Sequence, residues 1–323
     1  MKQTMLAVTR ETYGGPDVMC LSRVDRPIPK ADQVLVEVEA TSVNPFDWHQ
    51  LTGRPWLVRL PALFKPSVRI LGADIAGTVV AVGDQIQDFK PGEAVFGDIN
   101  FGAFAQFAIA QPHMLARRPD GVTVEDAGVV GIAGLTALQA VRDWGRVQAG
   151  EKVLINGASG GVGAYAVQIA IAFGAEVTGV CSAANTALVR RLGADRVIDY
   201  KSTDFATEQV RYDVVIDLVA NRGPRAIGRI LADNGRWVLV ALNIPRFLVS
   251  SLFGRWLLGG SNKTTTFKIA EIRQDDLATL ARMLAEGQIR SVIDRSFSLE
   301  DVPKAMSYLA TKRAKGKVAI RLE

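Results

Sequence analysis

The sequence predicts an α/β protein in which a doubly wound parallel sheet is inserted into a mostly-β domain. The chain has 323 residues, which is more than a single hydrophobic core usually holds. Residues 1–125 show strand and turn patterns, whereas beyond them short apolar runs alternate with helical patterns, as in a parallel sheet covered by helices. The pattern changes again after residue 262. We therefore expect one domain to comprise 1–125 and 265–323, and the other 126–264.

Alternation and turn signals predict the strands of the first domain. Residues 34–40 (VLVEVEA) alternate apolar and acidic side chains, as in a half-buried strand. Residues 68–82 contain two glycines, which suggests bent strands in a compact barrel-like sheet. A Pro-Gly turn signal then precedes a short apolar run at 94–96.

The second domain is expected to begin with a short helix at 124–127, capped by Thr123. The expected strands are 152–156, 175–181, 196–199, 214–218 and 237–241, and the expected helices are 135–144, 163–173 and 187–192. The last of these strands is apolar and is expected near a sheet edge. Because an unpaired edge strand readily recruits a second copy, we expect a homodimer.

The C-terminal residues are expected to return to the first domain. Residues 274–286 form an amphipathic helical pattern that ends at a glycine. Strands at 290–297 and 317–322 are expected on either side of a helix at 302–309.

Composition and charge exclude several classes of function. The net charge is only +5, and the longest basic cluster, at 312–317, carries no interleaved aromatic side chains, so no nucleic-acid partner is expected. Two cysteines cannot build a disulfide framework and the N-terminus lacks a signal-length apolar core, which favours a cytoplasmic location. The most apolar stretch, 247–258, is interrupted by Arg255 and is too short to span a membrane. We expect it to form a partly buried helix or a lid.

A glycine-rich loop is the strongest local motif. It reads Asn-Gly-Ala-Ser-Gly-Gly-Val-Gly over 156–163, follows a predicted strand and opens a predicted helix. Glycines let the backbone approach a pyrophosphate, and the unpaired N–H groups of the helix N-terminus attract its negative charge. The residues expected to bind the phosphates are Ser159, Gly160, Gly161, Val162 and Gly163.

The second strand of this domain indicates which dinucleotide binds. NAD-specific domains usually carry an acidic residue at its end, about 20 residues beyond the loop. Here Cys181 and Ser182 stand at that point. A 2′-phosphate would meet no repulsion, and Ser182 and Asn185 could donate hydrogen bonds to it. The sequence therefore favours NADPH, and we expect Cys181→Asp to reverse the preference.

Several further motifs occur in a recognisable order. They are Ser-Val-Asn-Pro-Phe-Asp-Trp at 42–48, Gly-Ala-Asp-Ile-Ala-Gly at 72–77, Pro-Gly-Glu-Ala-Val-Phe-Gly at 91–97, Ala-Gly-Leu-Thr-Ala-Leu at 133–138 and Leu-Gly-Ala-Asp-Arg-Val-Ile-Asp-Tyr at 192–200. Over nearly its whole length the chain resembles the medium-chain dehydrogenase/reductase superfamily, on its zinc-free quinone oxidoreductase (zeta-crystallin-like) branch. The resemblance implies a GroES-like catalytic domain, formed by both chain ends, with an inserted Rossmann domain that binds the dinucleotide.

The resemblance also bears on metal and substrate. Zinc-dependent members bind their catalytic metal through a cysteine and a Gly-His-Glu segment, where this chain has Asn44 and Gly-Ala-Asp at 72–74. Two cysteines and two histidines do not make a standard closed site, so we expect no metal. Without a Lewis acid, hydride addition to a conjugated carbonyl is easier than oxidation of an unactivated alcohol, because the product anion is delocalised. The expected substrate is a quinone or an α,β-unsaturated carbonyl compound.

The resemblance assigns catalytic roles residue by residue. Asn44 is similar to the family's active-site asparagine, near the nicotinamide and the substrate oxygen, and Thr136 is similar to a threonine that borders the nicotinamide. His49 falls near a tyrosine position of related quinone reductases, where it could donate a proton to the reduced product. Asp47 is expected to order its loop through hydrogen bonds.

The resemblance also places residues at the 2′-phosphate. Tyr200 matches a tyrosine that contacts this phosphate in quinone oxidoreductases. Those enzymes often use a lysine after the second strand, where this chain has Asn185 nearby. Lys312 or Arg313 could replace a C-terminal arginine that serves the same phosphate.

Three alternatives share parts of this pattern. An enoyl-thioester reductase on the same fold would use the same chemistry, and a non-catalytic NADPH-binding protein, such as a redox sensor, would keep only the cofactor site. A short-chain dehydrogenase would match the glycine spacing and a Tyr308-x-x-x-Lys312 pair. Enzymes of that family, however, have their glycine loop close to the N-terminus, whereas in this chain the loop begins only at residue 156. Turnover of a simple quinone with NADPH separates an enzyme from a sensor.

Overall fold

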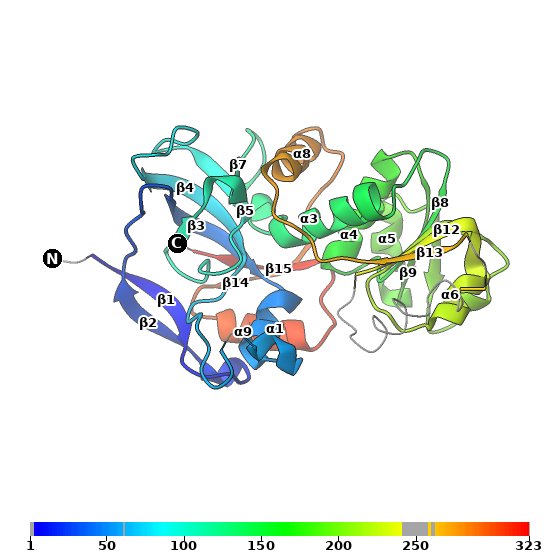
Figure 1. Ribbon diagram of the computed structural model, residues 1–323, viewed down its shortest axis with the longest axis horizontal. Coiled ribbons are helices and arrows are strands. Elements are labelled where there is room, and N and C mark those ends of the chain that lie inside the picture. Colours follow the sequence, from blue (N-terminus) through cyan, green and yellow to red (C-terminus); the bar gives the residue numbers. More distant parts are fainter. Residues whose placement is uncertain (1–2, 61, 241–257, 260–261, 323) are drawn as a thin grey trace. The chain divides into compact units, whose positions relative to one another are not determined.

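The chain divides into two compact units, which are described separately (Figure 1). The computed structural model describes residues 3–60, 62–240, 258–259 and 262–322. The first unit comprises Met1–Ile132 and Ile272–Glu323, and the second comprises Ala133–Glu271. The divisions thus fall at 132/133 and 271/272 instead of 125/126 and 264/265. The second one lies further on because a strand at Thr264–Phe267 pairs into the parallel sheet.

A seven-stranded sheet forms most of the first unit. Its strands are β3 (Val34–Val43), β4 (Asp74–Val82), β5 (Ala94–Asp98), β6 (Phe107–Ala110), β7 (Leu115–Arg117), β14 (Ile293–Ser298) and β15 (Lys317–Arg321). They follow the order β14-β15-β3-β4-β5-β7, and β6 pairs with β3. Two further strands, β1 (Thr4–Arg10) and β2 (Met19–Asp25), pair with each other as an antiparallel hairpin.

The long strand β3 joins the two parts of the chain that make up this unit. Val34, Val36 and Val38 are buried on it while Glu37 is exposed, as the alternating pattern predicts. At its far end β3 pairs antiparallel with β15, so that Val43 lies opposite Val318. The C-terminal strand therefore completes the sheet, and it brings residue 317 beside the residues that follow β3.

The helices of the first unit are short. They are α1 (Pro45–Thr52), α2 (Val124–Ala127), α8 (Gln274–Ala285) and α9 (Val302–Ala310), with single turns η1 (Pro16–Val18), η2 (Trp56–Arg59) and η3 (Pro112–Met114). The predicted cap of α2 is confirmed, because the Thr123 side chain accepts a hydrogen bond from the Asp126 N–H at 3.0 Å. A Ser, Thr or Asp cap of this kind satisfies one of the N–H groups that a helix start leaves unpaired.

A six-stranded parallel sheet forms the second unit. Its strands are β8 (Lys152–Asn156), β9 (Glu176–Cys181), β10 (Arg196–Asp199), β11 (Tyr212–Asp217), β12 (Leu231–Leu239) and β13 (Thr264–Phe267). They lie in the order β10-β9-β8-β11-β12-β13, which is the Rossmann strand order. The strand expected near a sheet edge is β12, which lies next to the outer position; within the described residues β13 pairs with it and takes that outer position.

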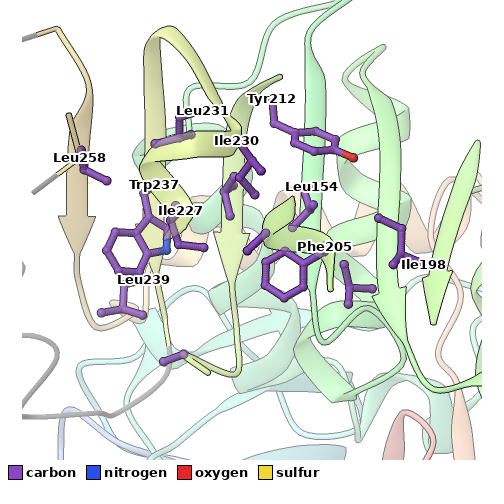
Figure 2. Packing of buried hydrophobic residues seen from close by; sticks show 14 residues of the cluster. Leu154, Ile198, Phe205, Tyr212, Ile227, Ile230, Leu231, Trp237, Leu239 and Leu258 are labelled. Atoms are coloured by element: carbon purple, nitrogen blue, oxygen red, sulfur yellow. The ribbon is translucent and has the colours of Figure 1, made fainter. Parts of the chain in front are cut away.

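The helices of the second unit connect these strands. They are α3 (Gly131–Gln139), which continues as the π-helix η4 (Ala140–Trp144), then α4 (Gly161–Ala172), α5 (Thr186–Arg191) and α6 (Pro224–Ile230), with turns η5 (Ala183–Asn185) and η6 (Phe205–Thr207). Figure 2 shows the apolar cluster on one side of the sheet, where the indole of Trp237 lies near Ile227 and Leu239. All three are fully buried, which fixes α6 against β12.

The apolar stretch at 247–258 lies outside the described residues except for Leu258. That side chain is buried in the cluster of Figure 2. Within the described part of the chain, helices are too short or too polar to traverse a bilayer.

Candidate functional site

The glycine-rich loop lies at the carboxyl end of β8 and leads into α4. Gly160 takes the N-cap position and α4 begins at Gly161. A Cβ on Gly163 would lie 2.1 Å from the carbonyl oxygen of Gly157, so only glycine fits there. The first N–H groups of a helix have no partner within it and carry partial positive charge. This loop therefore has the geometry that phosphate binding requires.

The structure brings four of the predicted cofactor residues to one place beside this loop. The Asn185 Nδ2 donates to Ser159 Oγ at 3.0 Å, which joins the turn after β9 to the loop. Ser182 is the N-cap of the same turn, η5. The backbone N–H of Tyr200 donates to the Cys181 carbonyl at 3.1 Å, which places Tyr200 next to the end of β9 with its side chain exposed.

Only one of the two polar atoms of the Asn185 side chain has a hydrogen-bond partner among the described residues. Its Oδ1 is buried and accepts no hydrogen bond within the described part of the chain. Buried polar atoms are nearly always paired, so an orphaned acceptor at this position indicates a missing donor from water or from a ligand. A ribose hydroxyl has the required chemistry, and the residues therefore fit a dinucleotide.

The structure also changes two details of the argument for NADPH. Cys181 is buried, so Cys181→Asp would place a carboxylate in the core beside Asp199 instead of at the nucleotide. The half-buried residue directly after the strand is Ser182. Sequence reasoning also missed Asp199, which arrives from β10 and accepts the N–H groups of Ala183 and Lys201, both at 3.1 Å.

A buried polar cluster marks the point where the strand order of the second unit reverses, between β8 and β11. The Asn156 Nδ2 donates to Asp217 Oδ1 at 2.8 Å and to Asn221 Oδ1 at 2.9 Å. Asp217 Oδ1 also accepts the Ala220 N–H at 2.8 Å, and burial raises the pKa of this carboxyl. Ligands of open α/β sheets bind at such reversal points. The cluster holds the ends of β8 and β11 in place. No motif in the sequence predicted this cluster.

The predicted active-site asparagine lies in a second polar network, within the first unit. Asn44 is the N-cap of α1 and is only 2% exposed. Its Nδ2 donates to Asp74 Oδ2 at 3.1 Å, and its Oδ1 accepts a hydrogen bond from the ammonium group of Lys317. Lys317 Nζ also lies 3.0 Å from Asp74 Oδ2, which makes a buried ion pair. Both polar atoms of the Asn44 side chain are therefore engaged inside the protein.

Asp74 is the centre of this network. It is fully buried at the start of β4. Its Oδ2 accepts a hydrogen bond from Ser42 as well as from Asn44 and Lys317. Its Oδ1 accepts the N–H of Ile132, in the first turn of α3, at 2.7 Å. Asp74 thus ties the end of β3 to the beginning of α3.

Two more carboxyls surround Asp74. Asp47 accepts the Asn44 N–H at 2.9 Å and the Gly72 N–H at 3.0 Å, so its predicted role in ordering the loop is confirmed. Burial, and then repulsion from Asp74, raises the pKa of Asp47 to about 7. The same two causes raise the pKa of Asp98 to about 7. Lys317 opposes both shifts as the compensating charge.

The hydrogen bonds of Asp74 described above do not include the other predicted residues. His49 is half-buried on α1, and its Nδ1 lies 2.6 Å from the Arg54 carbonyl oxygen. A carbonyl only accepts, so Nδ1 carries a hydrogen and Nε2 is the nitrogen left for proton exchange. Thr136 is half-buried on α3, in the second unit. Lys312 and Arg313 are exposed just beyond α9, in the first unit, and their role at a phosphate stays a prediction.

The Tyr308-x-x-x-Lys312 pair does not form a catalytic pair. The Tyr308 hydroxyl donates to Asp294 Oδ2 at 2.6 Å, which links α9 to β14. That hydrogen bond raises the pKa of the phenol, the opposite of what a catalytic tyrosinate requires.

The residues at the expected metal position do not fit zinc. Asn44 and Asp74 present amide and carboxylate oxygens to an ammonium group, whereas catalytic zinc sites are built from thiolates, imidazoles and carboxylates. In the part of the chain that the structure describes, histidine, cysteine and acidic side chains form no group able to hold a metal ion. The cation that the Asn44 and Asp74 oxygens contact is the Lys317 ammonium group.

A basic cavity of about 520 Å³ lies elsewhere on the second unit. It is lined by Arg211, Arg225, Arg229 and Lys263, together with Gly228, Leu258 and Gly259. Arg211 precedes β11, so this cavity is at the amino ends of the parallel strands. The glycine-rich loop follows the carboxyl end of β8, so the cavity is not the dinucleotide site.

Comparison with known proteins agrees with this architecture. The alcohol dehydrogenase GroES-like domain family matches residues 30–120, and the zinc-binding dehydrogenase family matches residues 192–320. The trans-enoyl reductase pgmF of Aspergillus terreus is 37% identical over 313 residues, which cover 90% of this chain and 87% of that protein. The chloroplastic quinone-oxidoreductase QR1 of Triphysaria versicolor is 32% identical over 330 residues, covering 98% of each.

A solved structure shows the same fold. The quinone oxidoreductase from Coxiella burnetii aligns with a TM-score of 0.88 and 26% identity, covering 99% of this chain and all of that one. The chain is therefore an oxidoreductase that belongs to the medium-chain dehydrogenase/reductase superfamily, whose members use a nicotinamide dinucleotide. Within that superfamily it falls on the quinone oxidoreductase-like branch.

Proposed function

We propose that this protein is an NADPH-dependent, zinc-independent reductase of quinones or α,β-unsaturated carbonyl compounds. The observation that carries the proposal is the buried network of Asn44, Asp74 and Lys317 at the position where zinc-dependent relatives bind their metal. The Lys317 ammonium group already binds the side chains of Asn44 and Asp74, so no metal ion is needed to hold them in place. Conjugated carbonyls suit such a site, because hydride addition gives a delocalised enolate or hydroquinone anion.

The second unit would hold the cofactor. Ser159, Gly160, Gly161, Val162 and Gly163 would bind the pyrophosphate, and Ser182, Asn185 and Tyr200 would bind the adenosine ribose and its 2′-phosphate. The unpaired Asn185 Oδ1 supports this assignment. When bound, NADPH supplies the hydride, and a proton must follow to complete the two-electron reduction.

His49 is the candidate donor of that proton. Its Nδ1 is committed to the Arg54 carbonyl, which holds the ring in one orientation. The protonated ring could then release a hydrogen only from Nε2. Thr136, at the start of the second unit on α3, is the candidate for lining the nicotinamide.

The test is a substrate panel followed by NADPH absorbance. We expect turnover with 9,10-phenanthrenequinone and with 2-cyclohexen-1-one, and no oxidation of cyclohexanol with NADP⁺. Efficient oxidation of the alcohol would contradict the proposal. A chain that binds NADPH without reducing any member of the panel would instead be a sensor.

An enoyl-thioester reductase is the second candidate, because pgmF is a trans-enoyl reductase by name. Both candidates reduce an activated double bond, so they differ in the group attached to the carbonyl. Adding trans-2-butenoyl-N-acetylcysteamine to the panel separates them. A kcat/KM at least tenfold higher for the thioester than for either quinone or ketone would favour this alternative.

A further inference from the structure

The Lys317–Asp74 ion pair is buried, and a buried ion pair does not by itself stabilise the folded protein. Lys317 is 4% exposed and Asp74 is fully buried. Removing two charges from water costs more than their attraction commonly returns, so an apolar pair of similar volume would often be at least as stable. The pair therefore calls for a role other than holding the fold together.

The contacts of the pair converge on one side chain. Asp74 accepts a hydrogen from Asn44 Nδ2 at 3.1 Å, and Lys317 donates to Asn44 Oδ1. A carboxamide has a donor end and an acceptor end, and a flipped Asn44 would point its Nδ2 at the ammonium group and its Oδ1 at the carboxylate. Both contacts would then be repulsive, so the pair permits a single orientation.

The same pair reaches a second element. Asp74 Oδ1 accepts the N–H of Ile132 in the first turn of α3, and Thr136 lies four residues further along that helix. A Cβ on Gly131 would lie 2.6 Å from Asp74 Oδ1, so a side chain at this position would prevent the first turn of α3 from packing this closely against Asp74. The carboxylate at 74 is therefore hydrogen-bonded both to Asn44 and to the first turn of α3.

We infer that Lys317 is a positioning residue for the proposed reduction, acting through Asn44, whose carboxamide it holds in one orientation together with Asp74. This inference rests on the proposed function. Lys317 is too buried to be offered as a proton donor, and within the described residues its ammonium group is hydrogen-bonded to Asn44 and Asp74.

The first test is a double-mutant cycle on kcat, using Asn44→Ala, Lys317→Met and both together. We expect each single substitution to lower kcat roughly 10- to 100-fold, since small misplacements near reacting groups have effects of that size. The double variant should lose no more than Asn44→Ala alone, because Lys317 has nothing left to position. The KM for NADPH should stay within about twofold, because the glycine-rich loop is in the other unit.

The matched control is Arg236→Met, which removes the cation of a part-buried pair with Glu151 in the second unit. It makes the same chemical change away from both networks and should leave kcat unaltered. Multiplicative losses in the Asn44/Lys317 cycle would overturn the inference, as would a folded Lys317→Met variant with the kcat of the wild type. If Lys317→Met does not fold, Lys317→Gln replaces it in the cycle.

A second measurement needs no activity and no variant of Lys317. The side-chain amide hydrogens of Asn44 should exchange slowly with solvent in ¹⁵N-resolved spectra of the wild type, where they are assigned by their loss in Asn44→Ala. Rapid exchange would overturn the inference even in an active enzyme. Conversely, slow exchange in a protein that reduces no quinone, enone or enoyl thioester would leave the network intact and overturn only the proposed function.

Discussion

At the scale of single residues, buried polar atoms carry more information about this protein than exposed ones. Asn44 was expected from its motif to face the reacting groups, yet both of its side-chain atoms are occupied by Asp74 and Lys317. Asn185, by contrast, keeps a buried oxygen without a partner in the described residues. Buried polar groups are usually compensated, so the first residue is held rigidly, and the second is the better candidate for binding a ligand.

The end of β9 should decide the choice of cofactor, and Ser182 is the position to change. We expect the wild type to prefer NADPH by roughly 30-fold, about 2 kcal/mol, because a 2′-phosphate gains charge-assisted hydrogen bonds that partial exposure weakens. Ser182→Asp should reverse that preference by repelling the phosphate and accepting from the ribose hydroxyls. The measurement is the ratio of kcat/KM values with NADPH and NADH. Ser307→Asp, an exposed serine on α9, adds the same charge elsewhere and should leave the ratio unmoved.

The raised pKa of Asp98 predicts a dependence of stability on pH. Folding keeps this carboxyl protonated up to a pKa of about 7, whereas in the unfolded chain it ionises near 4. Its contribution to the free energy of unfolding is therefore present below pH 4 and is lost as the pH rises to about 7.

Asp98→Asn should remove this dependence. The variant keeps an oxygen to accept the Asn100 N–H, which lies 2.9 Å from Asp98 Oδ1 in the wild type. Relative to wild type it should gain stability between pH 4 and 8, on the order of 2–4 kcal/mol. Urea unfolding at several pH values measures this, with the exposed Asp120→Asn as the control. A difference that does not change with pH would show that Asp98 is ionised in the folded protein.

At the scale of elements, strand ends and helix starts place the candidate residues. The carboxyl ends of β8, β9 and β10 bring the glycine loop, Ser182 and Tyr200 to one edge of the parallel sheet. The pairing of β15 with β3 brings residue 317 to residue 44 across almost the entire chain. Sequence motifs identified the first arrangement because a strand–loop–helix order is local. They missed the second because Lys317 looked like part of a basic cluster on the surface.

The start of α4 should not tolerate a side chain at position 163. In Gly163→Ala the new Cβ would lie 2.1 Å from the Gly157 carbonyl oxygen, so the loop must move. We expect a loss of about 1–3 kcal/mol in the free energy of unfolding and at least a tenfold weaker Kd for NADPH. Gly223→Ala is the control, since it meets no atom within 4 Å and has a negative φ. Wild-type affinity in Gly163→Ala would mean that the loop does not hold the pyrophosphate.

At the scale of the whole molecule, the chain combines a mostly-β unit built from its two ends with an inserted Rossmann unit. Within the described residues, β13 takes the outer position of the parallel sheet, beside the strand that the sequence placed near the edge. Its Thr264–Phe267 backbone is paired on one side by β12. Among the described residues no strand pairs with its other side, which has the hydrogen-bonding groups that edge strands commonly use for assembly.

We therefore expect a homodimer formed through the parallel-sheet units. Two copies of β13 related by a twofold axis would continue the sheet across the interface. Light scattering over a range of protein concentrations should give about twice the chain mass of 34.8 kDa. A mass equal to that of one chain at all concentrations would rule out this assembly.

The side chains at the expected metal position of the first unit predict an enzyme that works without zinc. The oxygens of Asn44 and Asp74 contact the Lys317 ammonium group, which already supplies them with a positive charge. Elemental analysis of the purified protein should find far less than one zinc per chain, and chelators should leave quinone turnover intact. Stoichiometric zinc, lost together with activity on chelation, would contradict this expectation.

By itself the sequence determined the order and type of most elements, because their signals are local. Strand 152–156, strand 196–199 and the cap at Thr123 all appear where alternation and capping chemistry placed them. It also determined the superfamily, since several short motifs in a fixed order are specific. The glycine loop needed only its strand-and-helix context to be identified.

Only the tertiary structure decided which polar groups meet. Asp98, Asp199, Asp217 and Lys317 each meet a polar group that lies far away in the sequence, as well as nearer ones, and their own segments give no sign of that distant partner. Their burial is set by sheet pairing and by the close approach of backbone at glycines, which periodicity does not encode. Electrostatic effects depend on distance and desolvation in three dimensions, and so the raised pKa values and the internal ion pair follow from the fold and not from any motif.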